Sequence, residues 1–252
     1  MSYQKTVQQA KHKQQPLKAD RFVKISDRSD QGDIPAPVWG KLLENYLLQS
    51  WKGMILSKGV TEIGLYPMLL YELRPKTIIE IGAFNGGSAV WFADHLELFG
   101  VEGSVYSIDI DLSLLDEQAK TDSRINFLEG DGNNLSTVLP PELLSTLPHP
   151  WLVIEDAAPV EVVGLLDYFH NNGLQSGDYL IIEDTNQSIW DAWSDNWEDK
   201  EELDQGREKM DTLRQWLMKY EDKYLVDTYY LDMYGYNGSK NWNSVLKKVE
   251  IS

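Results

Sequence analysis

The amino-acid sequence predicts an α/β fold in which a doubly wound, mostly parallel sheet of seven strands ends in a C-terminal antiparallel hairpin. Three observations predict this class. Short apolar segments alternate with helical segments from residue 76 onward, a glycine-rich turn follows the first of them, and two β-rich runs flank a Gly/Asn turn near the C-terminus. Apolar strands separated by helices are typical of a parallel sheet that is covered on both faces.

The N-terminal part of the chain is expected to precede the sheet. Residues 1–34 are polar and weakly patterned, which predicts a tail that is mobile unless it is docked, and residues 35–252 form the predicted domain. Within residues 35–75, apolar spacing indicates one helix over residues 38–51 and a second over residues 66–75, ended by its proline.

Strands and helices then alternate along the chain. Residues 77–82 are a predicted buried strand, and a helix starts at Ser88. Further helices are predicted up to residue 120, over residues 160–171 and over residues 207–223, before the terminal hairpin. The other predicted strands cover residues 104–110, 124–130, 151–156 and 178–185.

Composition restricts the functional classes. The formal net charge of −17 disfavours a nucleic-acid backbone or an anionic membrane as partner, because both are negative. The absence of cysteine excludes disulfides and thiolate chemistry. The first residues lack the apolar core of a secretory signal, and no apolar run is long enough to span a bilayer. We therefore expect a soluble, cytoplasmic protein with a small-molecule partner, and a homo-oligomer is left open.

The most informative segment is the turn EIGAFNGGS, which runs from Glu80 to Ser88. Glycines let the backbone pass close to a ligand, and the following helix offers free amides. A dinucleotide site would have its second glycine where Phe84 stands, and this ring would crowd a pyrophosphate. S-adenosylmethionine (SAM) has no pyrophosphate, and its cationic end suits a carboxylate before the turn. The spacing therefore favours SAM over a dinucleotide, with predicted contacts from Glu80, Gly82, Phe84 and Ser88, and a glycine-rich turn without a ligand is the remaining alternative.

Polar residues at the ends of the next two strands complete the predicted cofactor site. Asp109 can accept hydrogen bonds from both ribose hydroxyls of an adenosine, which fits NAD as well as SAM. The turn Asp131-Gly132-Asn133 suits the edge of an adenine, and an ordinary turn explains it equally well.

Two stretches of the chain resemble known methyltransferases. Residues 80–90 resemble the SAM-binding turn of the catechol O-methyltransferase type, in which E-x-G-A-aromatic-x-G-x-S-A-V recurs. Residues 51–186 resemble the cephalosporin hydroxylase and rhamnosyl O-methyltransferase family through YELRP at residues 71–75, GGS at 86–88 and EDTN at 183–186. The resemblance implies a class I methyltransferase that binds SAM, and it is much less specific for the substrate.

Carboxylates follow the two strands that are predicted to neighbour the cofactor strand. Asp156 ends the fourth strand, and Glu183 and Asp184 end the fifth. We expect all three at the carboxyl edge of the sheet, where they repel one another unless a cation is bound. Oxygen ligands suit a hard cation such as Mg²⁺. The family resemblance implies the same divalent-metal site, and solvated carboxylates without a metal are the alternative.

The predicted site has no obvious general base. Many members of the resembled family carry His or Lys three residues after the aspartate, a position held here by Pro159. The four histidines are predicted to lie in the tail, late in helices or before the fourth strand. Deprotonation is therefore assigned to the metal, aided by Asp156 or Asp184 as catalytic residues or by a residue that the sequence does not identify.

The segment after the fifth strand is acidic and rich in tryptophan. Residues 187–206 show no clear secondary-structure period and are interpreted as a candidate lid. Trp190, Trp193 and Trp197 could form a wall around a substrate, and packing on the domain or on a partner subunit explains them equally well.

These inferences give one leading hypothesis and two alternatives. The first is a SAM-dependent, metal-assisted O-methyltransferase acting on a small hydroxylated molecule, a natural-product or sugar intermediate. The second is a nicotinamide-dependent oxidoreductase on the same fold, against which Phe84 counts. The third is a non-catalytic protein of this fold that serves as a partner, which the missing base would allow.

Overall fold

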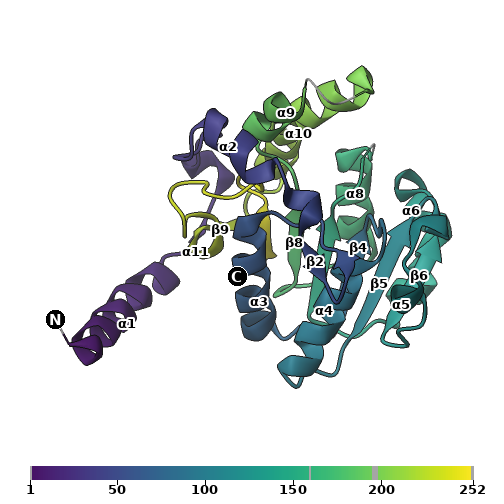
Figure 1. Cartoon of the computed structure of the whole chain (residues 1–252), viewed down its shortest axis with the longest axis horizontal. Helices are drawn as coiled ribbons and strands as arrows, with labels where there is room; N and C mark the ends of the chain where they lie inside the picture. Colours follow the sequence, from purple (N-terminus) through teal and green to yellow (C-terminus); the bar gives the residue numbers. More distant parts are fainter. Residues whose placement is uncertain (1, 159, 195–197, 251–252) are drawn as a thin grey trace.

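The computed structural model of the chain describes residues 2–158, 160–194 and 198–250. Its centre is a sheet of eight strands in the order β1-β9-β10-β8-β7-β4-β5-β6 (Figure 1). The strands from β8 to β6 are parallel, and β10 runs antiparallel to both of its neighbours. The predicted class is confirmed, with one strand more than expected. The strands are β1 (Phe22–Val23), β4 (Thr77–Ile81), β5 (Ser104–Asp109), β6 (Ile125–Glu129), β7 (Trp151–Glu155), β8 (Tyr179–Ile182), β9 (Tyr224–Asp227) and β10 (Val245–Lys248).

Helices cover both faces of the sheet. α3 and α4 pack together on one face, and α8 and α10 pack together on the other (Figure 1). The central strands β4 and β7 are consequently buried along their whole length, as expected for parallel strands with long apolar runs. The helices are α1 (Tyr3–Ala19), α2 (Ala36–Leu43), α3 (Val60–Leu73), α4 (Gly87–Leu98), α5 (Glu117–Lys120), α6 (Leu135–Val138), α7 (Pro141–Leu144), α8 (Val162–Asn172), α9 (Gln187–Trp193), α10 (Lys200–Lys219) and α11 (Thr228–Leu231).

The first 34 residues are not a uniform tail. α1 is exposed and projects from the body, whereas β1 pairs with β9 at the edge of the sheet (Figure 1). Ile25 is fully buried, and the Arg28 guanidinium donates two hydrogen bonds of 2.7 and 2.8 Å to the Asp232 carboxylate. Residues 21–34 are therefore docked on the domain, the case that the prediction allowed, because buried apolar and charged contacts hold them.

The interval predicted as one helix over residues 38–51 is divided in the structure. α2 ends at Leu43, a 3-10 turn follows, and β2 (Ser50–Trp51) pairs with β3 (Met54–Ile55) in a separate two-stranded sheet. The single-helix prediction is wrong because its apolar residues serve two different cores. α3 begins at Val60, earlier than predicted.

α2, α9 and the N-terminal half of α10 form a layer beside the carboxyl edge of the parallel strands, which we call the cap. α9 and α10 occupy most of residues 187–206, so the prediction of no regular structure there is wrong for the described residues. Side-chain caps rather than apolar spacing start these helices: Asn186 accepts from the Ser188 amide, and Asp199 from the amides of Glu201 and Glu202. The cap has its own small core, formed by Trp39, Leu43, Ile189, Trp190 and Leu203.

The C-terminal strands β9 and β10 are adjacent and antiparallel, as predicted, but no tight turn joins them. α11 and residues 232–244 make the connection, and this segment buries Asn237, Lys240 and Asn241. A polar loop thereby enters the protein interior next to the end of β8. Among the described residues, no helix combines the length and apolar character needed to cross a bilayer.

Candidate active site

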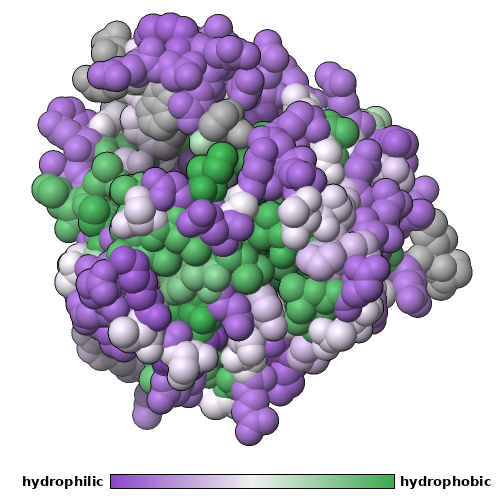
Figure 2. Space-filling view, turned by 90° about the vertical axis from the view of Figure 1, so that its right-hand side faces the viewer, coloured by the Kyte–Doolittle hydropathy of each residue, from purple (hydrophilic) through white to green (hydrophobic). Residues whose placement is uncertain are grey.

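A cavity of about 580 Å³ opens at the carboxyl ends of the parallel strands. Exposed apolar residues at its mouth include Leu47, Phe84, Ile110 and Leu114. Figure 2 shows apolar side chains gathered at the centre of one face of the molecule, bordered by hydrophilic ones. Seven of the eight residues predicted to bind the cofactor line this cavity: Gly82, Phe84, Ser88, Asp109, Asp131, Gly132 and Asn133.

The glycine turn is shaped by a close backbone contact. Gly82 has φ of +105°, and a Cβ atom there would lie 2.1 Å from the carbonyl oxygen of Asp156. Phe84 also has a positive φ, and its amide donates a 2.7 Å hydrogen bond to Oδ2 of Asp109. The other oxygen of Asp109 accepts from the Asp111 amide at 3.3 Å. Asp109 therefore fixes the turn and lines the cavity, and each of its oxygens keeps a lone pair beyond those that accept from the Phe84 and Asp111 amides.

Glu80 is the one predicted cofactor residue that does not line the cavity. Its side chain is fully buried, and one of its oxygens accepts a hydrogen bond from Ser107 Oγ at 2.6 Å. Burial raises the pKa of Glu80 to about 7, although the Lys58 ammonium opposes this shift. Direct contact between Glu80 and a cofactor remains a prediction.

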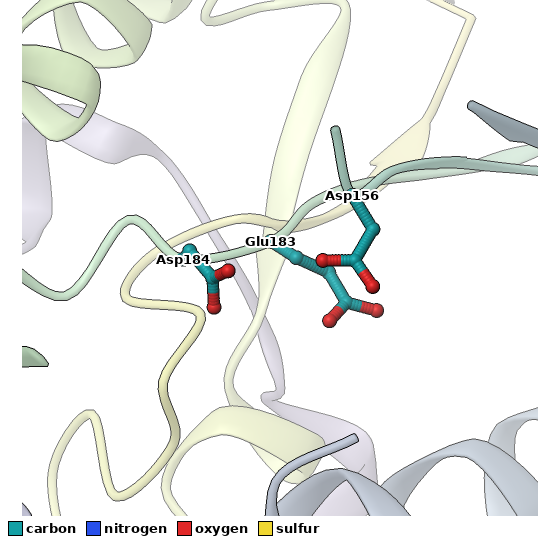
Figure 3. Close-up of side chains that lie close together, drawn as sticks. All are labelled: Asp156, Glu183 and Asp184. Carbon is teal, nitrogen blue, oxygen red and sulfur yellow. The ribbon is translucent and has the colours of Figure 1, made fainter. Parts of the chain in front are cut away.

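The structure brings Asp156, Glu183 and Asp184 together directly after β7 and β8 (Figure 3). One carboxylate oxygen of each lies within 4.8 Å of the others. The backbone continues the ladder beyond the strands: the amide of Asp156 donates to Ile81 and that of Glu183 to Glu155, both at 2.8 Å. Adjacent parallel strands whose carboxyl ends are in register thus deliver the three carboxylates to one place.

Two buried lysines neutralise much of this negative charge. Lys58 forms ion pairs with Asp156 and, at 2.8 Å, with Oε1 of Glu183. Lys240 lies 2.7 Å from Oε2 of Glu183 and 2.7 Å from Oδ1 of Asp184. Lysine ammonium groups therefore supply two positive charges from within the chain, so repulsion among the carboxylates does not by itself require a metal, and the metal site stays a prediction.

The lysines also set the ionisation of the carboxylates. Burial by itself would raise the pKa of Asp156, but Lys240 and Lys58 outweigh it and lower this pKa to about 2. Burial does raise the pKa of Asp184, against the opposing charge of Lys240. The pKa of Lys58 is raised, since Asp156 and Glu183 outweigh its burial. Asp156 is accordingly ionised at neutral pH and Lys58 protonated.

The donor set also fits a divalent cation. Oε2 of Glu183 and Oδ1 of Asp184 are fully buried and have no hydrogen-bond donor of suitable geometry among the described residues, although the Lys240 ammonium lies 2.7 Å from each. Three carboxylates with two such oxygens are the kind of ligands that Mg²⁺ prefers.

A second cavity of about 450 Å³ adjoins the first and shares several lining residues with it, including Asn133, Trp190 and Lys209. Lys209 of α10 reaches under the cap and forms a 2.6 Å ion pair with Oε2 of the fully buried Glu155. This contact ties the cap to the strand that precedes Asp156. Together the cavities extend from the glycine turn to the underside of the cap.

The tryptophans of the cap have different environments. Trp190 is buried, its indole Nε1 donates to the carbonyl oxygen of Asp184 at 2.6 Å, and its ring lies against Gly206. Trp193 contacts the rings of Trp190 and Tyr46, and it lines the larger cavity. Trp197 lies outside the described residues, and so does Pro159. The packing role is thus seen for Trp190, and a substrate-facing role stays open for Trp193.

The site residues that sequence reasoning missed are cations and their neighbours. Lys58 precedes α3, Lys240 lies in the connection between β9 and β10, and Tyr66 donates from α3 to Glu183. No spacing motif joins these positions to the carboxylates. The one signal in the sequence for these lysines was the predicted acidic cluster itself, because buried carboxylates need positive charges nearby.

None of the described histidines lines either cavity. His95 contacts the carbonyl oxygen of Trp91, His149 pairs with Asp178, and His170 contacts the Tyr224 hydroxyl. This agrees with their predicted positions away from the carboxyl edge.

The parallel sheet, its antiparallel C-terminal strands and the cavity at its carboxyl edge define a class I methyltransferase fold. A structure of the O-methyltransferase TomG from Streptomyces achromogenes shares this fold at 14% identity, with a TM-score of 0.50 over 86% of this chain and 91% of that one.

The chain belongs to the rhamnosyl O-methyltransferase/CmcI family, which it matches over residues 45–241. It is similar to a rhamnosyl O-methyltransferase of Mycobacterium tuberculosis, 26% identical over 149 residues, covering 54% of this chain and 57% of the relative. The Mycobacterium leprae protein of the same name is 28% identical, with 60% of it covered. The match thus spans little more than half the length of these relatives.

Solved structures of CmcI extend the similarity to most of the chain. A CmcI structure with Mg and SAM is 26% identical, with a TM-score of 0.64 and 92% of both chains covered. The apo form is 28% identical, with a TM-score of 0.63, covering 89% of this chain and 88% of that one.

Proposed function

We propose that this protein transfers a methyl group from SAM to a hydroxyl group of a small molecule, a sugar or another natural product. The observation that carries the proposal is one cavity that joins the glycine turn and Asp109 to Asp156 and Asp184. A methyl donor at one end and a hydroxyl at the other would meet inside it. The rhamnosyl O-methyltransferases and the CmcI structure with Mg and SAM support the donor and the acceptor class.

The donor would bind along the ends of β4, β5 and β6. Gly82 and Ser88 line the part of the cavity next to the turn, where helix α4 begins and offers amides. The carboxylate of Asp109 has lone pairs left for two ribose hydroxyls. Asp131, Gly132 and Asn133 would contact the adenine. A cationic ligand nearby would favour the charged form of Glu80, whose pKa burial raises.

Asp156, Glu183 and Asp184 would hold a divalent cation such as Mg²⁺. When bound, the cation would lower the pKa of the acceptor hydroxyl and help to fix its oxygen beside the methyl group. Lys58 keeps Asp156 ionised, so this carboxylate can accept a hydrogen bond from the acceptor hydroxyl. The cap, held by Lys209 on Glu155, would exclude water from the reacting groups.

Binding and turnover test the proposal separately. In calorimetry, S-adenosylhomocysteine should bind and NAD should not; the reverse result would establish the oxidoreductase alternative. Turnover with a hydroxylated sugar should stop in excess chelator and return with Mg²⁺. Binding without turnover of any acceptor would support the non-catalytic alternative, and turnover that persists in chelator would exclude a catalytic metal.

The matched variants are Asp156→Asn and Asp191→Asn. Asp156→Asn should abolish turnover while S-adenosylhomocysteine affinity stays within a factor of two or so. Asp191 is an exposed cap residue that pairs with Arg207 at 3.0 Å, so Asp191→Asn should keep turnover. An equal loss of turnover in both variants would contradict the proposed role of Asp156 in the reaction.

A further inference from the structure

We propose that Lys240 is the built-in counter-ion of the carboxylate cluster, and that a divalent cation binds there by displacing the Lys240 ammonium toward Glu62. This exchange presupposes the metal site of the proposed function. Lys240 lies in the connection between β9 and β10, where its side chain is buried and lines the larger cavity. It is therefore placed to enter and leave the cluster from the cavity side.

The Lys240 ammonium lies among the oxygen atoms that a metal would need. Its Nζ is 2.7 Å from Oε2 of Glu183, 2.7 Å from Oδ1 of Asp184 and 3.8 Å from Oδ1 of Asp156. Each carboxylate of the cluster in Figure 3 thus presents one oxygen to the same lysine. Mg²⁺ binds carboxylate oxygens at about 2.1 Å, and two like charges that share these oxygens would repel each other at short range. Metal and ammonium therefore compete for one position.

Lys58 is held in a different way from Lys240. Lys58 donates hydrogen bonds to Oδ2 of Asp156 and, at 2.8 Å, to Oε1 of Glu183, which are the other oxygens of these two carboxylates. Oε2 of Glu183 and Oδ1 of Asp184 have no donor of suitable geometry among the described residues, although Lys240 lies close to both. A contact with poor hydrogen-bond geometry is given up more easily than charge-assisted hydrogen bonds. Lys58 can therefore stay in place when a cation enters, and Lys240 is the lysine that leaves.

Glu62 is a fourth carboxylate, and it lies beside the Lys240 side chain. It is fully buried, and its Oε1 accepts from Ser239 Oγ at 2.7 Å and from the Lys240 amide at 3.3 Å. Both side chains lie against Gly59, where a Cβ atom would be 2.2 Å from Oε2 of Glu62 and 3.4 Å from Cδ of Lys240. The Lys240 charge also opposes the rise that burial causes in the pKa of Glu62. Turning the end of the Lys240 side chain would therefore bring its ammonium from Asp184 to Glu62.

Calorimetric titration of the full chain with MgCl₂, without SAM or acceptor, tests the exchange. Lys240→Met should tighten Mg²⁺ binding by about tenfold or more, because a like charge beside the same oxygens is removed. Lys240→Arg keeps the charge and should bind Mg²⁺ no more tightly than the unmodified protein. Lys52→Met is the matched control, since it removes the same charge from an ion pair with Asp94 outside both cavities and should leave the affinity unchanged. Thermal melting checks that each variant is folded, and Lys240→Gln gives the same comparison should Lys240→Met fail to fold.

The destination of the ammonium is tested by a second substitution. Glu62→Gln should weaken Mg²⁺ binding, because the displaced ammonium loses the carboxylate that receives it. In a Lys240→Met background the same change should have little effect, since no ammonium is displaced there. An equal weakening in both backgrounds would mean that Glu62 acts on the metal through its own charge, and this would overturn the proposed exchange.

Three further results would overturn the proposal. Equal Mg²⁺ affinities for the unmodified protein and Lys240→Met would leave the metal site in place and exclude displacement. Equal gains in Lys240→Met and Lys58→Met would show an effect of overall charge and not of a shared position. Absence of Mg²⁺ binding in every variant, with S-adenosylhomocysteine still bound, would refute the metal site of the proposed function and the exchange with it.

Discussion

Replacing Lys58 with methionine should destabilise the protein strongly and alter its response to Mg²⁺. The Lys58 side chain is fully buried, and its ammonium pairs with Asp156 and Glu183. Methionine keeps a similar length and removes the charge. Breaking a buried ion pair by removing one partner costs about 3–5 kcal/mol, because the other partner is left uncompensated.

The pKa of Asp156 gives an independent magnitude. Burial raises it, yet the two lysines bring it down from 3.8 to about 2. At about 1.36 kcal/mol per pKa unit, this shift is worth about 2.5 kcal/mol. Because the folded-state pKa is depressed, the contribution is present above pH 3.8 and is lost as the pH falls through 2. Lys240 remains in Lys58→Met, so we expect a loss near the lower bound, about 3 kcal/mol at pH 7.

Urea unfolding in chelator measures this loss against a matched control. Lys52 is half-exposed and pairs with Asp94 at 2.7 Å, so Lys52→Met should cost less than about 1 kcal/mol. Mg²⁺ should then raise the melting temperature of Lys58→Met more than that of the unmodified protein, because the cation replaces the missing charge. Equal stabilities for Lys58→Met and Lys52→Met would refute the charge-compensation argument.

Three further predictions follow from the cap and the cofactor site. Gly206→Ala should lower the free energy of unfolding in urea by about 1–3 kcal/mol, because the new Cβ would lie 2.3 Å from the Trp190 ring. Gly40→Ala is the control, since its Cβ would have its nearest neighbour at 3.8 Å and should leave this free energy unchanged. Equal losses in the two variants would contradict the contact with Trp190. Burial raises the pKa of Glu80 from 4.5 to about 7, so the free energy of unfolding should fall as the pH rises from 4.5 to about 7, and this fall should be missing in Glu80→Gln. Asp109→Ala should weaken S-adenosylhomocysteine binding by about 1.5–3 kcal/mol in calorimetry, and unchanged affinity would move the ribose contact to Asp111.

The fold could be predicted because its signals are local in sequence. Apolar runs such as residues 77–82 and 151–156 predict buried parallel strands without any knowledge of which strands are neighbours. The glycine turn comes directly after the first of these runs in the sequence. The cap could not be predicted, because Asn186 and Asp199 start its helices through side-chain caps within an acidic stretch that has no apolar period.

The site could be predicted only in its acidic half. Asp156, Glu183 and Asp184 follow neighbouring strands, so topology alone brings them together. Lys58 and Lys240 come from irregular segments whose positions depend on tertiary packing. Because no motif in the sequence indicated these lysines, the acidic cluster suggested a metal as the balancing charge, with solvated carboxylates as the alternative.

The origin of Lys240 has a consequence for the order of folding. Ribosomal synthesis releases the N-terminal part of a chain first, so Lys58 and all three carboxylates emerge before Lys240 does. Until the connection between β9 and β10 is in place, Glu183 and Asp184 lack their ammonium partner at 2.7 Å and should stay hydrated. Completion of this acidic pocket is therefore expected to be a late event in folding, after the parallel strands have paired.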